Sequence, residues 1–133
     1  MNIVITGGSG FVGSYLCEKL INDGHEIIVV DNLLTGSTEN INHLMHNENF
    51  LFIEHDVQNH IEIENKVDYV LHFASAASPK AYTEHPVNTL KAGSVGTINT
   101  LGLAKKHDAE YLLASTSEAV SYTHLTLPTN QCV

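Results

Sequence analysis

The sequence predicts an α/β fold with a doubly wound parallel sheet, and three observations support this prediction. Short apolar runs alternate along the chain with stretches of helical periodicity. A glycine-rich turn joins the first apolar run to the first helical stretch, and Asp31 ends the second apolar run. Because parallel neighbouring strands need crossover connections, such alternation favours a sheet with helices on both faces.

Five buried strands are predicted, and we expect the sheet to be truncated after the fifth. They fall at residues 2–6, 26–30, 50–54, 67–72 and 110–115. The first helix is predicted over residues 10–23, where Val12, Leu16 and Leu20 recur every four positions. Gly24 follows this stretch and supplies its C-terminal stop.

Two further helices are expected. A short one is predicted around residues 39–45, within a polar and irregular stretch. A long one begins at Pro86, which suits a first helical turn, and runs to about residue 106. Small residues over 92–96 would let this helix approach a neighbour closely. Its apolar residues share one stripe: Val87, Leu90, Ile98 and Leu101.

Composition and charge exclude several classes of protein. The 133 residues fit one domain, and no apolar run approaches a membrane span. A formal net charge of -9 without any arginine argues against nucleic acid or an anionic membrane as partner. A strand beginning at residue 2 leaves no room for a signal peptide, and two cysteines suggest no disulfide framework. We therefore expect a cytoplasmic protein.

The nine histidines do not predict a metal site. His43 and His46 lack a convergent carboxylate or cysteine partner, and His72 ends an apolar strand. We interpret them as solvated or core side chains.

The glycine-rich turn has the spacing of a phosphate-binding loop. Gly7, Gly10 and Gly13 form a G-x-x-G-x-x-G pattern between the first strand and the first helix. The first glycine allows a sharp turn, the second lets the backbone approach a pyrophosphate, and the third lets helix pack against strand. The first amides of the helix would then point at the phosphates. The pattern is typical of a Rossmann dinucleotide-binding fold.

Asp31 is the candidate ribose ligand. It lies 24 residues after Gly7 at the end of the second strand, close to the roughly 20 expected. A carboxylate there accepts hydrogen bonds from ribose hydroxyls and repels a 2′-phosphate, so NAD is favoured over NADP. The alternative is a glycine turn that only closes a strand–helix corner, with Asp31 a solvated strand end.

Three further segments carry a family resemblance: residues 31–36, 72–79 and 115–118. Together with the glycine loop they resemble the extended short-chain dehydrogenases/reductases, the NAD-dependent epimerase/dehydratase family. Within it the chain is most similar to the UDP-glucuronate decarboxylases, with the dTDP-glucose 4,6-dehydratases close behind. Residues 74–82 and 101–106 favour the decarboxylases, and the resemblance covers residues 1–118.

The resemblance implies NAD contacts along the carboxyl ends of the strands. The residues that would contact the pyrophosphate, the adenosine ribose, the adenine and the nicotinamide are Gly7, Gly10, Phe11, Val12, Gly13, Asp31, Asn32, Thr35, Gly36, Asp56, Val57, Phe73, Ala74, Ser75 and Ala114. Lys91 and Asn99 would reach the nucleotide sugar or hold the wall of the site. Thr116 would hydrogen-bond the 4-hydroxyl of the sugar, and Glu118 takes the place of an acid/base in the dehydratases.

The family chemistry also shows what this chain lacks. NAD takes a hydride from C4 of the sugar, carbon dioxide leaves from the resulting β-keto acid, and NADH returns the hydride. The base is a Tyr whose pKa is lowered by a Lys four residues later. Here only Tyr15 and Lys19 have this spacing, and they lie in the cofactor helix. We expect this chain to be an inactive part of an NAD-dependent carboxy-lyase, dehydratase or epimerase.

Residues 119–133 depart from the family pattern. Residues 120–129 match the translation of a common transposase-type sequencing adapter, and the flanking codons agree with it. We therefore predict an incomplete NAD-binding domain over residues 1–118, a non-native tail over 119–133, and no substrate lobe. The alternative is a divergent C-terminal segment.

Other functions stay open. A 4,6-dehydratase or UDP-sugar 4-epimerase would share the same front half, and a non-catalytic NAD-sensing module would need no Tyr/Lys pair. The resemblance also implies a homodimer formed through the long helices, with residues 87–106 as the interface.

Overall fold

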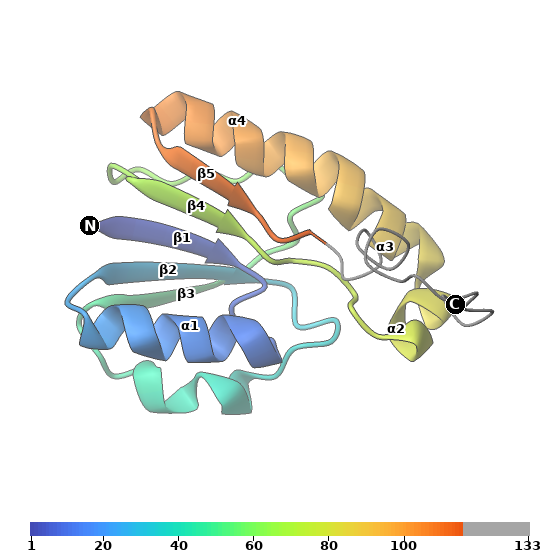
Figure 1. The fold of residues 1–133 in the computed structure, drawn as a ribbon, viewed down its shortest axis with the longest axis horizontal. Helices are drawn as coiled ribbons and strands as arrows, with labels where there is room; N and C mark the ends of the chain where they lie inside the picture. The colour runs from blue at the N-terminus through green and yellow to red at the C-terminus, as the bar shows by residue number, and fades with distance from the viewer. Residues whose placement is uncertain (116–133) are drawn as a thin grey trace, which may run out of the picture.

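The computed structural model describes residues 1–115 of the chain. Its five strands form one parallel sheet in the order β3-β2-β1-β4-β5 (Figure 1). The strands are β1 (Asn2–Thr6), β2 (Glu26–Asp31), β3 (Phe50–Glu54), β4 (Tyr69–His72) and β5 (Glu110–Leu113). The predicted parallel sheet is confirmed. Its order changes direction between β1 and β4, and ligands bind at such switch points in open α/β sheets.

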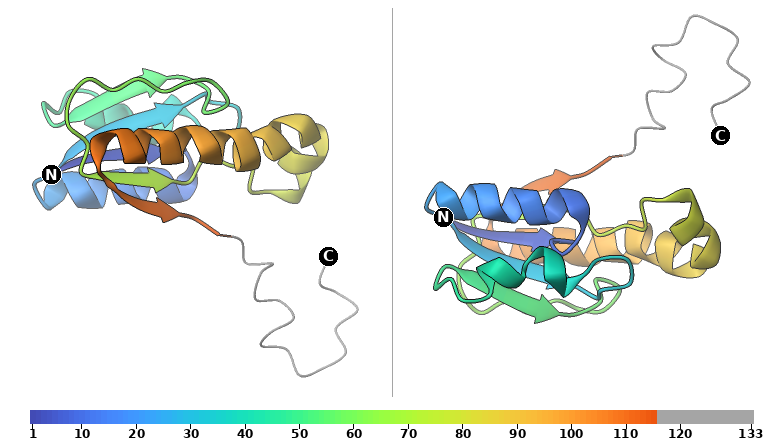
Figure 2. Two further views of the ribbon diagram at one scale, coloured as in Figure 1. Left: turned by 90° about the horizontal axis from the view of Figure 1, so that it is seen from above. Right: turned by 90° about the horizontal axis from the view of Figure 1, so that it is seen from below.

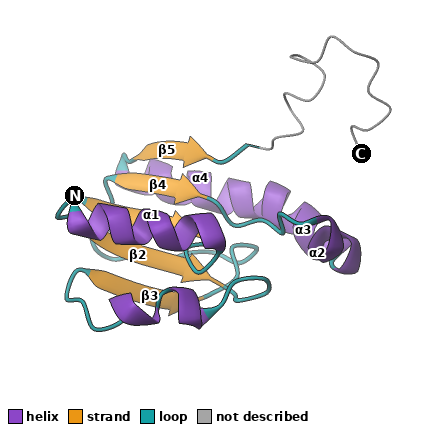
Figure 3. Ribbon diagram, turned by 60° about the horizontal axis from the view of Figure 1, so that its bottom comes forward, coloured by secondary structure: helices purple, strands orange, loops and turns teal. Residues whose placement is uncertain are grey.

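Helices cover both faces of the sheet (Figures 2 and 3). One face carries α1 (Phe11–Asn22) and two short 3-10 turns, η1 (Thr38–Asn40) and η2 (Asn42–Leu44), which replace the helix expected around residues 39–45. The opposite face carries α4 (Thr97–His107), which contacts β4 and β5. The predicted doubly wound arrangement is therefore present.

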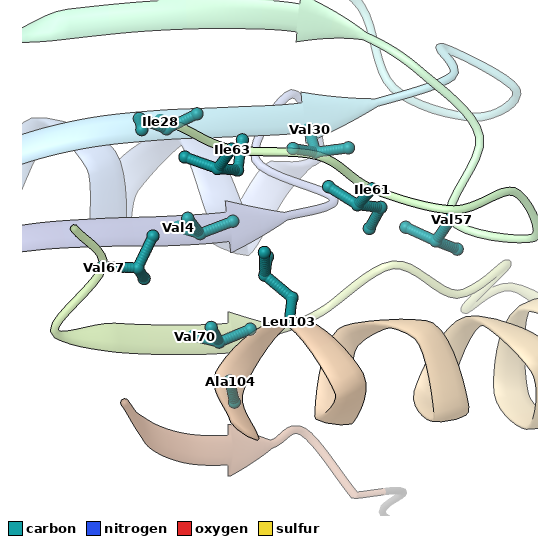
Figure 4. Packing of buried hydrophobic residues seen from close by; sticks show 10 residues of the cluster. All are labelled: Val4, Ile28, Val30, Val57, Ile61, Ile63, Val67, Val70, Leu103 and Ala104. Carbon is teal, nitrogen blue, oxygen red and sulfur yellow. The ribbon is translucent and has the colours of Figure 1, made fainter. Parts of the chain in front are cut away.

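The core divides into two clusters, one on each side of the sheet. Alternate residues of β1 point to opposite faces, so Ile3 and Ile5 join the cluster beneath α1 while Val4 joins the other. On the second side, Leu103 and Ala104 extend from α4 toward the sheet (Figure 4). Residues between β3 and β4 also close this side, although that connection contains no helix: Val57, Ile61, Ile63 and Val67.

Helix α1 is confirmed, but its buried face is offset by one residue from the predicted stripe. Val12 is 59% exposed, whereas Cys17 and Ile21 are buried. The reason is local, because Gly13 packs against Gly7 and Gly8, just after β1, and so fixes the rotation of the helix. Gly24 follows the helix with a φ of 85°, as its predicted role requires.

The long helix is confirmed in extent and corrected in detail. It consists of α3 (Pro86–Lys91), one π-helical turn (Ala92–Gly96) and α4, and a short helix α2 (Pro79–Glu84) that was not predicted precedes it. A side chain at Gly96 would collide with Val57, so that small residue does permit close approach. The apolar stripe, however, faces away from the core, with exposed fractions of 60% at Val87, 72% at Leu90, 67% at Ile98 and 45% at Leu101.

Candidate functional site

The candidate site lies where the carboxyl ends of β1, β2 and β4 meet. The glycine loop follows β1, Asp31 ends β2, and residues 73–75 follow β4. The register pairs Thr6 with His72 and with Val30, so these three strand ends lie at the same height. The topology therefore brings together the segments that the sequence singled out.

The glycine loop is constrained at its first and third glycines. Gly7 has a φ of 75°, and a Cβ there would lie 2.8 Å from the backbone nitrogen of Ala74. A Cβ on Gly13 would lie 2.7 Å from the Cα of Gly8 and would also strike the Gly7 carbonyl. Both positions need glycine for the reasons that the spacing predicted.

Gly10 differs, because little in the protein crowds it. It caps α1 with an extended backbone, and a Cβ there would meet only the Gly7 carbonyl oxygen, at 3.3 Å. The first turn of α1 has no acidic residue, and Phe11 and Val12 are 77% and 59% exposed. An accessible helix N-terminus beside a glycine is suited to bind an anion such as pyrophosphate.

Asp31 is buried, with 8% of its surface exposed, and its carboxylate supports two loops. Oδ2 accepts a hydrogen bond from the Ser9 amide at 3.0 Å, and Oδ1 accepts one from the Leu33 amide at 2.9 Å. Leu33 is held at a φ of 58°, a conformation that is uncommon for a residue other than glycine. The carboxylate is thus fixed in position, and each oxygen keeps acceptor capacity for a ribose hydroxyl.

Ser9 is a site residue that sequence reasoning missed. It is fully buried, and its carbonyl accepts hydrogen bonds from the Ser37 amide at 3.2 Å and from Asn40 Nδ2 at 2.8 Å. A Cβ on Gly36 would collide with Ser9 Oγ, so residues 36–40 close against the glycine loop. Within residues 1–115, Ser9 Oγ has no hydrogen-bond partner. Its position between two glycines gave no signal of this role.

The residues expected at adenine form a polar cluster after β3. Asp56 accepts hydrogen bonds from Asn32 Nδ2 at 2.9 Å and from the Gln58 amide at 2.9 Å. Val57 is buried against the long helix. Asn32 thereby links the end of β2 to the segment after β3. Thr35 is exposed.

The two candidate substrate residues differ in their surroundings. Asn99 Nδ2 donates to the carbonyl of Val57 at 2.8 Å and to that of Asn59 at 3.0 Å. Its amide therefore ties the long helix to the segment that follows β3. Lys91 is exposed on α3.

The segment expected at nicotinamide is hydrogen-bonded to the end of β1, directly before the glycine loop. The Phe73 amide donates to the Thr6 carbonyl at 3.0 Å, and the Ala74 amide donates to Thr6 Oγ1 at 3.3 Å. The Ala114 amide donates to the His72 carbonyl at 3.0 Å, which places Ala114 beside this segment. Ser75 is exposed. The expected catalytic residues Thr116 and Glu118 lie outside the described residues.

Residues 1–115 contain neither a candidate membrane span nor a candidate metal site. None of their helices has both the length and the apolar character needed to cross a membrane. Their His, Cys, Asp and Glu side chains form no group of three that could hold a metal ion.

Comparison with known proteins agrees with this geometry. The model of the NAD dependent epimerase/dehydratase family matches residues 3–131. This chain belongs to that family. It is 54% identical over 116 residues to UDP-glucuronic acid decarboxylase 1 of Danio rerio, an alignment that covers 87% of this chain and 27% of the relative. UDP-glucuronic acid decarboxylase 1 of Arabidopsis thaliana is 52% identical over 118 residues, with coverages of 89% and 27%.

Solved structures match the fold. UDP-N-acetylglucosamine 4-epimerase from Methanobrevibacter ruminantium M1, in complex with UDP-N-acetylmuramic acid, gives a TM-score of 0.80 at 28% identity, covering 98% of this chain and 42% of that one. The dTDP-glucose 4,6-dehydratase of Bacillus anthracis str. Ames, in complex with NAD, gives 0.74 at 27% identity, with coverages of 89% and 38%. The chain thus spans less than half the length of the relatives it matches.

Proposed function

We propose that residues 1–115 bind NAD at the carboxyl edge of the sheet, as part of a nucleotide-sugar decarboxylase that converts UDP-glucuronate to UDP-xylose. One observation carries the proposal: the buried Asp31 carboxylate is hydrogen-bonded to the glycine loop itself, through the Ser9 amide. A ribose ligand and a phosphate loop that share a hydrogen bond form a preorganised dinucleotide site.

The residues present fit the dinucleotide. The first-turn amides of α1 would hold the pyrophosphate, with the open face of Gly10 allowing its approach. Asp31 and Asn32 would hold the adenosine ribose, and Asp56 and Val57 would contact the adenine. Residues 73–75 would line the nicotinamide. The bound cofactor would supply reversible hydride acceptance from the sugar, while these residues orient it.

The decarboxylase assignment and the inactivity of this chain belong to the proposal. Support for the substrate comes from relatives named UDP-glucuronic acid decarboxylase at 46% to 54% identity. Lys91, Thr116 and Glu118 are the residues that we assign to the sugar side. Support for the inactivity of this chain comes from the sequence, in which no Tyr-x-x-x-Lys follows β5. We also keep the proposal that residues 119–133 are a non-native tail. A cytoplasmic location, and the absence of nucleic-acid and membrane partners, stay predictions.

A homodimer is the second part of the proposal. The apolar stripe of α3 and α4 is exposed, with 72% of Leu90 and 67% of Ile98 accessible. Large apolar side chains gathered on one helix face mark protein interfaces. The proposed partner is a second copy of the complete protein, packed through the same helices.

An epimerase or dehydratase is the alternative that one observation favours. Similar solved structures include 4-epimerases and a 4,6-dehydratase, and their TM-scores reach 0.80. These enzymes share the NAD-binding half, so the choice depends on the sugar-binding residues of the complete protein. A basic residue placed to hold the substrate carboxylate would favour the decarboxylase.

Calorimetric titration of this chain with NAD and, separately, NADP tests the cofactor assignment. We expect NAD to bind more tightly. Gly10→Ala should weaken binding by about tenfold to a hundredfold, because a methyl group displaces a charge-assisted amide contact with phosphate. Gly102→Ala, in α4 with nothing within 4 Å of the new Cβ, is the matched control and should bind as the wild type does. Equal binding by both variants, or no binding by the wild type, would reject the proposed cofactor site.

The activity assignment has its own test. This chain, mixed with NAD and UDP-glucuronate, should release no carbon dioxide above background. Turnover would show that the missing base is not needed, and it would reject the proposal that this chain is inactive.

A further inference from the structure

A buried hydrogen-bonded pair beneath the glycine loop joins segments that are 66 residues apart in sequence. Thr6 Oγ1 lies 2.6 Å from His72 Nδ1, and both residues are buried. Thr6 is the last residue of β1 and precedes the glycine loop directly, while His72 ends β4. Such a short contact between two buried polar side chains fixes the relative position of the two strand ends.

The same threonine oxygen holds the next segment of the site. It accepts a hydrogen bond from the Ala74 amide at 3.3 Å. Since the hydroxyl has one proton, and no other acceptor for it is found in the described part of the chain, it donates to His72 Nδ1. The imidazole proton is therefore on Nε2.

The other side of the ring faces the long helix. A Cβ on Gly96 would lie 3.8 Å from His72 Cε1, so the ring packs against the π-helical turn (Ala92–Gly96). Burial lowers the pKa of His72, and hydrogen bonding to the Ala92 backbone raises it in part. A π turn leaves a helical carbonyl without its usual donor, which an Nε2 proton can replace.

We propose that His72 is a positioning residue which, through Thr6, sets the position of residues 73–75 relative to the glycine loop and couples that position to the π turn. The chain of contacts runs from the Ala74 amide to Thr6 Oγ1 and from the Thr6 hydroxyl to His72 Nδ1, and the His72 ring packs against the π turn at Gly96. Its consequence for cofactor binding rests on the proposed function, since residues 73–75 are the segment assigned to nicotinamide.

The link itself is tested without any dinucleotide. In nitrogen-15 NMR spectra of this chain, His72 should show a protonated Nε2 and an unprotonated Nδ1. Thr6→Val should accelerate hydrogen exchange of the Ala74 amide by about fivefold or more, as expected for loss of one hydrogen bond, and should shift the Ala92 signals. Thr6→Ser, which restores the hydroxyl, should return both to wild-type values.

A control separates this link from general loss of stability. Val67→Ala removes buried methyl groups before β4 begins, away from the glycine loop, and should lower the melting temperature without a selective effect on Ala74. A proton on Nδ1, or unchanged Ala74 and Ala92 signals in Thr6→Val, would overturn the proposed link.

Titration with NAD then tests the positioning role. Thr6→Val should raise the Kd by about threefold to tenfold, and Thr6→Ser should stay within about twofold of wild type. An unchanged Kd in Thr6→Val, despite a displaced Ala74 amide, would contradict the positioning role. A wild-type chain that binds no NAD would reject the proposed function, whereas the link would still be decided by the NMR results.

Discussion

The two halves of this domain position their candidate functional residues by different means. In the half formed by β1, α1 and β2, the site is made of backbone, and its shape is set by glycines and by the carboxylate of Asp31. In the half formed by the long helix and β5, the candidate residues are side chains, the exposed Lys91 and the hydrogen-bonded Asn99, beside an exposed apolar stripe. The first half contains its own constraints, while the second presents surfaces suited to partners outside residues 1–115.

This difference predicts how each half responds to substitution. A site made of backbone cannot accommodate an added side-chain atom, because that atom meets main-chain atoms that cannot rotate away. An exposed helix face tolerates change in the isolated domain, because a surface side chain loses few contacts when it is replaced. Substitutions in the two halves should therefore differ in their effects on the stability of the domain and on its affinity for NAD.

The largest effect on stability is expected from substitution of Gly13. Gly13→Val should lower the free energy of unfolding by at least about 3 kcal/mol, because even a Cβ would lie 2.7 Å from the Cα of Gly8. Urea denaturation followed by circular dichroism measures the loss. Gly102→Ala is the control, in the interior of α4 with open space around it, and should stabilise by about 0.5–1 kcal/mol. Similar changes in the free energy of unfolding for the two substitutions would contradict the expected difference between the halves.

The next effect is expected at Asp31. Asp31→Asn keeps the shape but leaves one of two backbone amides facing an NH₂ group, so stability should fall by about 1.5–3 kcal/mol. Affinity for NAD should fall by about tenfold or more, and the preference for NAD over NADP should narrow, since the charge that repels a 2′-phosphate is gone.

Asp23→Asn is the matched control for this change. Asp23 lies at the opposite end of α1, where it forms an exposed ion pair with Lys19 at 2.7 Å. Exposed pairs contribute little, so stability should change by less than about 1 kcal/mol and NAD affinity should be unaffected. If Asp23→Asn lowered the affinity for NAD as much as Asp31→Asn does, net charge rather than local geometry would explain the binding.

A smaller effect is expected from the protonation of His72. Burial lowers its pKa, and hydrogen bonding to the Ala92 backbone offsets part of that change. Because the unfolded chain binds the proton more readily, stability is fully present above about pH 6.5 and declines as the pH falls toward the lowered pKa. One proton limits the slope to about 1.4 kcal/mol per pH unit.

Comparison with His72→Asn isolates this contribution from the other histidines. Asparagine can still accept from Thr6 but does not titrate, so its stability between about pH 5 and 6.5 should fall less steeply than that of wild type. Chemical denaturation at several pH values measures both slopes. Parallel curves would show that protonation of His72 is not coupled to folding.

The sequence predicted the site best where local backbone geometry decides it. Gly7 and Gly13 were identified from spacing alone, because a strand–turn–helix connection with these close approaches excludes any Cβ. The link between Thr6 and His72 was not predicted, because residues 66 apart become neighbours only through sheet pairing. Ser9 was missed for a similar reason, since its partners belong to residues 36–40.

Periodicity located the helices but not the faces they bury. The four-residue repeat in α1 includes Val12, which is exposed because the adjoining glycine loop fixes the rotation of the helix. In the long helix the repeat again marks an exposed stripe, while Thr100 and Leu103 face the sheet. The π turn was not anticipated either, since it accompanies tertiary contacts with His72 and Val57.

The smallest change in stability, with a distinct change in association, is expected from the exposed stripe. Leu90→Ser combined with Ile98→Ser should alter the free energy of unfolding by less than about 1 kcal/mol, because both side chains are largely exposed. Leu103→Ser, on the buried face of α4, should cost about 2–5 kcal/mol. Sedimentation velocity at several concentrations should show less self-association for the double variant than for wild type. Unchanged self-association would remove the stripe from the interface and leave the open edge at β5 as the surface to examine, whereas a large loss of stability would show that the stripe packs within the domain.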